Sequence, residues 1–284
     1  MKNADKGTGF ILPALLLLAA VTIYPLIQVI NLSFQRRLLI FDVVEFVGLQ
    51  NYIFLLEDER FWDALNNTAY FTTLSVTCEL ILGLAFALLL NRTFFGKGVA
   101  RAFILVPWAI PTVVSAKMWE WMYNTDFGIF NYLLGTKINW LGDPQWALNA
   151  AIFMDVWKTT PFVAIILLAG LQVIPRDLHS AARVDGAGSV SLFLSITLPL
   201  LKPVILIVVI FRCLDAFRIF DAVYVLTGGG PANTTETLSI YTYKVLFQTL
   251  QFGYGSTLAV AVFLCVGFIT VAFIGLIGKR FVHS

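Results

Sequence analysis

The chain has 284 residues, of which 59% are hydrophobic and 13% are charged, and its formal net charge is +2. Together with a mean hydropathy of +0.84, this composition excludes an ordinary soluble domain. Runs of about twenty apolar residues indicate membrane-spanning helices. The sequence predicts six of them, at residues 10–34, 65–91, 99–122, 147–174, 192–214 and 254–278.

The first run follows Lys2 and Lys6, as the apolar part of a signal peptide would. It is longer than such a segment and has no clear small-residue cleavage site, so it predicts an uncleaved anchor. Basic residues then set the orientation. Residues 91–101 hold three basic residues and no acid, which predicts a cytoplasmic loop and, with six crossings, cytoplasmic termini. Arg36 and Arg37 argue for the opposite orientation, although the acidic residues that follow at 57–59 suit an outer loop.

Two prolines divide the third run, at Pro107 and Pro111. Proline removes a helical hydrogen bond, so these residues loosen the helix and predict unwound backbone that faces a cavity. Trp108 and Thr112 lie beside them. Elsewhere, Cys78, Cys213 and Cys265 fall in separate apolar runs without metal-binding or redox spacing.

The fourth run contains Asp155, Lys158 and Thr159. A charge at the centre of a bilayer costs at least about 2.5–3.5 kcal/mol and normally faces a cavity or a partner. Asp155 and Lys158 are three residues apart, so the spacing predicts that they share a helical face and can pair.

A second charged set, at the outer end of the fifth run, alternates in sign at every third residue: Arg212, Asp215, Arg218 and Asp221. This spacing predicts a ladder of adjacent charges along one helix. For Arg218 and Asp221, a self-neutralising structural ladder and the lining of a cavity are both open.

A polar segment interrupts the apolar runs at residues 180–203, which read SAARVDGAGSVSLFLSITLPLLKP. Its charges and glycines must lie in water or against a partner. It resembles the signature loop of ABC importer permeases, in which Glu-Ala-Ala, three residues and Gly precede a hydrophobic-x-Leu-Pro ending. The matching positions are Ala181, Ala182, Asp185, Gly186, Ile196, Leu198, Pro199 and Pro203, whereas the usual Glu falls at Ser180. A simple cytosolic Asp-Gly turn is the alternative.

In that family the loop forms a coupling helix that docks into a cleft of the cytoplasmic ATPase. The resemblance therefore implies a coupling helix at about 176–190. The coupling residues that it implies are Ser180, Ala181, Ala182, Arg183, Asp185 and Gly186.

The resemblance extends over essentially the whole chain. Residues 48–52, 61–68 and 217–247 are similar to the carbohydrate-uptake branch, the maltose-permease type. It implies an all-α integral membrane protein with the type I importer fold. Its expected parts are an anchor with an outer loop at 1–64, a five-helix core at 65–278 and a cytoplasmic tail at 279–284.

The same resemblance implies location in the bacterial inner membrane. The expected partners are a second permease subunit that completes a heterodimer, two cytoplasmic ATPase subunits and an extracytoplasmic solute-binding protein. ATP and Mg²⁺ belong to the ATPase subunits, and no cofactor or metal is expected in this chain. The glycines at 228–230 lack the Lys and Ser/Thr of a phosphate loop and predict a turn.

Matching segments give candidate contacts for a sugar, polyol or glycoside. They are Trp108, Thr112, Asp155, Lys158, Thr159, Phe162, Arg212, Asp215, Ala216 and Ile219. For Trp108 and Phe162, packing in the core or against lipid is the alternative. None is expected to be catalytic.

Two functions of another class and one other kind of solute are the alternatives. A secondary transporter would need its own coupling-ion site, and the signature loop argues against it. A membrane-embedded enzyme would need convergent catalytic groups, yet the two histidines, His179 and His283, lie far apart in the chain. An ABC importer for a non-carbohydrate solute stays open.

Overall fold

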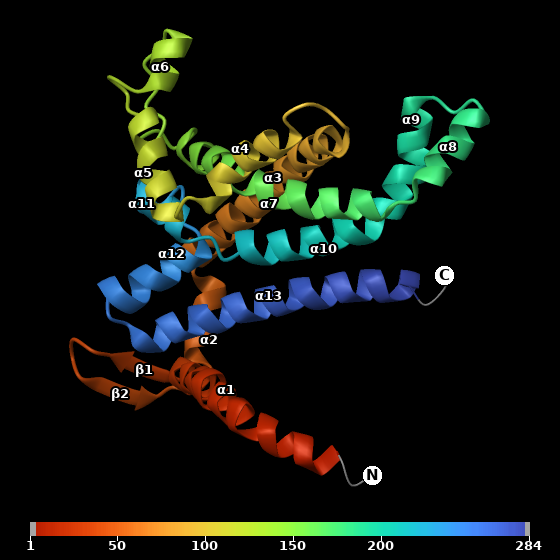
Figure 1. Cartoon of the computed structure of the whole chain (residues 1–284). Helices are drawn as coiled ribbons and strands as arrows, with labels where there is room; N and C mark the ends of the chain where they lie inside the picture. Colours follow the sequence, from red (N-terminus) through yellow and green to blue (C-terminus); the bar gives the residue numbers. More distant parts are fainter. Residues whose placement is uncertain (1–3, 282–284) are drawn as a thin grey trace. The chain divides into compact units, whose positions relative to one another are not determined.

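The structure is a computed structural model that describes residues 4–281, with side chains from 11 to 275 (Figure 1). Lys2, His283 and the end of the predicted 279–284 tail lie outside the described residues. Contacts divide the chain into two units. The hairpin unit comprises residues up to 62 together with 238–265, and the bundle unit comprises 63–237 together with the chain from 266 onward. The predicted division at residue 64 stays a prediction.

The hairpin unit contains the first candidate membrane span, the first part of the last one and a small sheet. Its elements are α1 (Ala4–Ser33), β1 (Gln35–Leu38), β2 (Val43–Phe46), α2 (Gln50–Glu57), the start of α3 (Glu59–Asn91), α12 (Leu238–Tyr243), the π-helix η2 (Lys244–Gln248) and the first part of α13 (Phe252–Phe281). The strands pair antiparallel, with Gln35 opposite Phe46. The sequence predicts no strand here, because four residues are too few for a clear alternating pattern.

Close packing holds the hairpin against the start of α13. The Leu39 N–H donates to the carbonyl of Leu250 (3.2 Å), and Leu38 forms a β-bridge with Gln251. A Cβ atom on Gly253 would lie 1.9 Å from the Gln35 carbonyl oxygen, so only glycine fits there. The hairpin is therefore fixed to the segment that leads into α13.

All the regular secondary structure in the described residues of the bundle unit is helical, and loops join the helices. Its elements are the rest of α3, α4 (Lys97–Ala109), α5 (Thr112–Met122), α6 (Ile129–Leu134), α7 (Ala147–Val173), α8 (Arg176–Val184), α9 (Ser189–Leu192), the π-helix η1 (Phe193–Thr197), α10 (Leu198–Ala216), α11 (Asp221–Thr227) and the end of α13.

The core of the bundle unit joins α3, α7 and α10 through buried aliphatic side chains: Ala87, Leu90, Val163, Leu167, Leu168, Leu171, Leu201 and Val208. Glycines allow the close approach. A Cβ atom on Gly83 would lie 2.6 Å from Val163, and one on Gly170 would lie 2.8 Å from Leu201. Small residues at helix contacts are typical of membrane bundles, where packing replaces the hydrophobic effect.

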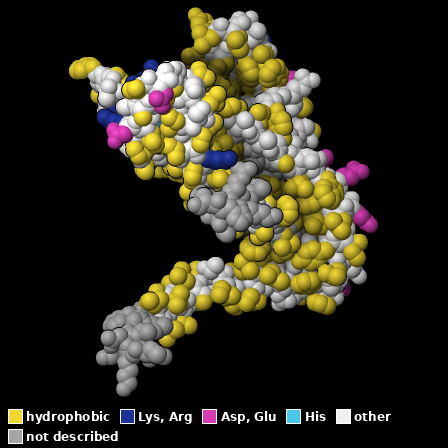
Figure 2. All heavy atoms as spheres, turned by 90° about the vertical axis from the view of Figure 1, so that its right-hand side faces the viewer, with side chains coloured by type: hydrophobic (Ala, Val, Ile, Leu, Met, Phe, Trp, Pro, Cys, Tyr) yellow, Lys and Arg dark blue, Asp and Glu magenta, His cyan; other side chains and the backbone are white. Residues whose placement is uncertain are grey.

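The described residues contain five helices long and apolar enough to cross a membrane, and six if the bent pair α4 and α5 counts as one span. This agrees with the six predicted runs. The most apolar stretch of α1 has no buried residue, and Figure 2 shows hydrophobic side chains over much of the visible surface. Such surfaces suit lipid or neighbouring membrane helices.

The third span is broken, with α4 and α5 bent by 92°. Ile110 is extended (φ −75°, ψ 134°), which is the conformation that the following Pro111 favours. The expectation of a proline-loosened helix is confirmed. The predicted charge ladder does not lie on one helix, because α10 ends at Ala216 and α11 begins at Asp221, which leaves Arg218 in the connection between them.

Candidate functional site

A buried arginine joins α3 to α10 inside the bundle unit. The Nε atom of Arg212 lies 2.5 Å from Oε2 of Glu79, and its Nη2 lies 2.8 Å from Oε1. Both side chains are almost completely buried. A two-point contact between guanidinium and carboxylate is among the strongest hydrogen-bonded ion pairs, so it fixes the two helices to one another.

The same guanidinium binds two further carboxylates. Its Nη2 lies 3.1 Å from Oδ2 of Asp155 on α7, and its Nη1 contacts Asp215 one turn further along α10. Asp155 is buried, whereas the Asp215 side chain is 69% exposed. One cation therefore meets three anions from three helices, and the cluster carries a formal excess of negative charge.

Thr159 adds a hydrogen bond between α7 and α3. Its hydroxyl lies 2.6 Å from Oε1 of Glu79 and 2.6 Å from the carbonyl oxygen of Asp155. Glu79 thus receives hydrogen bonds from Arg212 and Thr159. Such a network leaves little rotational freedom to its members.

Lys158 lies close to the break in the third span. Its Nζ donates to the carbonyl of Ile110 (2.6 Å) and is 3.4 Å from that of Trp108. The last carbonyls of α4 have no partner within that helix, and the ammonium supplies one. The predicted pairing of Lys158 with Asp155 is not found: Asp155 pairs with Arg212, because α10 packs against α7 at this level.

These groups border a cavity of about 410 Å³ in the bundle unit. Its lining is Trp108, Thr112, Asp155, Lys158, Thr159, Asp215, Arg218, Ile219, Phe220 and Asp221. The structure thus brings seven of the ten predicted contact residues together. The other three lie behind them: Phe162 stacks on Trp108 with ring centres 5.9 Å apart, and Arg212 and Ala216 are buried.

The predicted coupling residues lie at the end of an exposed helix. Ser180, Ala181, Ala182 and Arg183 belong to α8, which has no buried residue. Asp177 in its first turn and Arg183 in its last complement the helix dipole.

A Schellman motif ends α8. The N–H of Ala187 donates to the carbonyl of Ala182 (2.9 Å), and that of Gly186 to the carbonyl of Arg183 (3.1 Å). Gly186 has φ +84°, in the left-handed region that favours glycine. The signature glycine therefore has a structural reason: it ends the helix and turns the chain toward α9.

Comparison with known proteins decides the family. Residues 79–283 match the model for the binding-protein-dependent transport system inner membrane component. The chain belongs to this family. It is a multi-pass permease subunit of the inner membrane in a binding-protein-dependent ABC importer.

Several relatives match the permease over nearly its full length. It is 43% identical to the trehalose/maltose transport system permease protein MalF of Thermococcus litoralis (96% of this chain, 94% of the relative). It is 42% identical to the trehalose transport system permease protein SugA of Mycobacterium tuberculosis (98% and 91%). It is 40% identical to the sulfoquinovosyl glycerol transport system permease protein SmoG of Agrobacterium fabrum (88% and 83%).

A solved structure has the same fold as the permease. It is the bacterial alginate ABC transporter in complex with alginate pentasaccharide-bound periplasmic protein, matched with a TM-score of 0.85 at 20% identity (99% of this chain, 96% of that chain). The predicted type I importer fold is confirmed.

Sequence reasoning missed Glu79 of the permease. It is the one charged residue in the predicted span at 65–91. Because a charge is costly at membrane depth, this residue could have been predicted to face a partner or a cavity. The structure shows that this residue, with 0% exposure, is the main partner of Arg212.

Proposed function

We propose that this permease carries a sugar, polyol or glycoside as one of two membrane halves of an ATP-driven importer. The relatives named for trehalose, maltose and sulfoquinovosyl glycerol support a carbohydrate-like solute. The cavity beside the Arg212 cluster is the single structural observation that carries the proposal.

The lining of this cavity has the chemistry that sugars need. Hydroxyl groups of a sugar both donate and accept hydrogen bonds, and Lys158, Thr159 and Asp215 provide donors and acceptors. Trp108, backed by Phe162, supplies an aromatic face for the apolar C–H surface of a sugar ring. Because the Arg212 network restrains Asp155 and Thr159, their polar groups are held in place before a solute arrives.

The exposed surfaces support the proposed partners. The exposed α8 is available to one of the two ATPase subunits, and the other subunit binds the second membrane half. The apolar, unburied stretch of α1 suits a second permease subunit within the membrane. The solute-binding protein delivers the solute from the outer side.

Solute-dependent stimulation of ATP hydrolysis tests the carbohydrate proposal. In proteoliposomes that hold the complete complex and its binding protein, we expect disaccharides or glycosides to stimulate hydrolysis, and amino acids to leave it at the basal rate. Uptake of radiolabelled solute in the same vesicles is the second readout. Stimulation by amino acids or peptides alone would contradict the carbohydrate proposal and would support an importer of non-carbohydrate solutes.

A further inference from the structure

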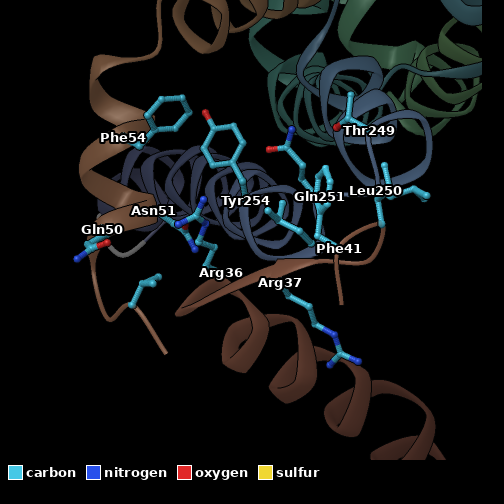
Figure 3. A pocket seen from close by; sticks show the side chains of 13 residues that line it. Arg36, Arg37, Phe41, Gln50, Asn51, Phe54, Thr249, Leu250, Gln251 and Tyr254 are labelled. Carbon is cyan, nitrogen blue, oxygen red and sulfur yellow. The ribbon is translucent and has the colours of Figure 1, made fainter. Parts of the chain in front are cut away.

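A polar pocket of about 320 Å³ lies within the hairpin unit (Figure 3). The β-hairpin, α2 and the segment that leads into α13 enclose it. Its lining is Arg36, Arg37, Leu38, Ile40, Phe41, Val47, Gln50, Asn51, Phe54, Thr249, Leu250, Gln251 and Tyr254. The lining contains two arginines, several amide and hydroxyl groups and no acidic residue, so its chemistry suits an anion.

Of the two arginines in the lining, Arg36 is the one whose side chain points toward the other labelled residues. Figure 3 shows its side chain beside Asn51 and near the Tyr254 ring, whereas Arg37 extends away from the other labelled side chains. This agrees with the strand geometry, because neighbouring residues of a strand point to opposite faces. Among the described residues, the Arg36 guanidinium makes no hydrogen bond or ion pair, although Glu45 is its partner in the strand register.

The pocket has a rigid floor. The amide of Asn51 donates to the carbonyls of Ser33 (2.8 Å) and Gln35 (2.9 Å), which ties α2 to the start of the hairpin. The Asp58 carboxylate accepts hydrogen bonds from Tyr241 (2.6 Å) and from Tyr254. These bonds hold the walls in place, so a ligand would meet a preformed site.

Exposed apolar side chains surround the charged centre. Ile40 is 63% exposed, Phe41 72% and Phe54 56%. An arginine among aromatic residues is the composition that dominates binding energy at protein interfaces. The hairpin that borders the pocket follows directly after α1, and Thr249 to Gln251 lead into α13, so the pocket lies on the predicted outer side of the membrane.

We propose that this pocket receives an acidic side chain of the solute-binding protein, whose carboxylate pairs with Arg36. The inference rests on the proposed function, because it assumes that a binding protein docks on the outer side. The pairing gives a reason for arginine in an outer loop, where the orientation rule disfavours it. The apolar rim excludes water around the ion pair and strengthens it.

Matched substitutions on the two neighbouring arginines test the proposal. The complete complex in nanodiscs is titrated with its solute-loaded binding protein, and ATP hydrolysis is followed. We expect Arg36→Gln to raise the half-maximal concentration of binding protein about tenfold, as for the loss of one charge pair at an interface. The rate of ATP hydrolysis at saturating binding protein should stay unchanged. Arg37→Gln should change that concentration less than twofold. Higher salt should reduce the difference in half-maximal concentration between wild type and Arg36→Gln, because salt screens the ion pair.

Three results would overturn the proposal while the proposed function stands. The first is equal behaviour of Arg36→Gln and Arg37→Gln. The second is a loss of ATP hydrolysis in Arg36→Gln that persists at saturating binding protein and depends on the concentration of solute, which would indicate a solute site. The third is a defect that depends on anionic lipid in the nanodisc, which would indicate a phosphate headgroup. A wild-type complex that no binding protein stimulates would overturn the proposed function, and this inference with it.

Discussion

Replacing Arg212 with methionine is expected to remove most of the folded permease from the membrane. The substitution keeps the length of the side chain but leaves Glu79 and Asp155 buried without their counter-charge. Breaking a buried ion pair by removing one partner costs about 3–5 kcal/mol, a large part of the stability of a typical domain. The measurement is the yield and melting temperature of the detergent-purified complex.

A matched control distinguishes this loss from a general effect of removing an arginine. Arg218 lies only six residues further along, and its Nε donates to the carbonyl of Leu214 (3.0 Å) rather than to a buried acid. We expect Arg218→Met to melt within a few degrees of wild type. Adding Glu79→Gln to Arg212→Met should recover part of the lost stability, because one uncompensated charge disappears. A wild-type melting temperature for Arg212→Met alone would show that the cluster is not structural.

The second large effect is expected at the exposed helix α8. Val184 is the last residue of α8, lies within its Schellman motif and is 88% exposed. An apolar side chain at this position is available to bind the ATPase cleft. We expect Val184→Asp to reduce stimulated ATP hydrolysis more than tenfold, on the order of the loss of a buried interface contact. Co-purification of the ATPase subunits with the permease is the direct measurement.

Two further variants separate docking from helix stability. An aspartate at the end of a helix opposes the helix dipole, whereas a lysine suits it. Val184→Lys should therefore leave α8 stable and still block docking, and Val184→Ile should keep both docking and activity. If Val184→Lys co-purifies with the ATPase subunits as wild type does, Val184 makes no contact with them.

Much of the fold was predictable because membrane helices carry a strong sequence signal. In a bilayer, the backbone N–H and C=O groups of about twenty apolar residues must hydrogen-bond within their own segment, which makes each such run a helix. The six runs therefore followed from composition, and the break in the third span followed from its prolines. The charges and glycines of the signature segment indicated that it leaves the membrane, and its resemblance to the family's loop implied the helix that the structure shows as α8.

The partners of the charged residues could not be predicted in the same way. Spacing along one helix predicted an ion pair between Asp155 and Lys158. In the structure, Asp155 instead pairs with Arg212 of another helix, and Lys158 donates to the carbonyls just before Pro111. Sequence spacing reports only neighbours on the same helix. Which helices pack together, and at what level, is decided by tertiary contacts such as those of Gly83.

The hairpin was missed for another reason. Its strands have four residues each and pair with one another. The end of the first strand also contacts residues more than 200 positions further along the chain, because Leu38 forms a bridge with Gln251 and the Leu39 N–H donates to the carbonyl of Leu250. Strand pairing of this kind depends on tertiary context more than on the residues of the strand.

We propose that this permease imports solute only with ATP hydrolysis and a loaded binding protein. This proposal is tested most directly by measuring labelled solute uptake and ATP hydrolysis together in proteoliposomes that contain the complete complex. We expect both rates to rise together when the loaded binding protein is added outside, and uptake to stop without ATP. Uptake driven by an ion gradient in the absence of ATP would contradict it.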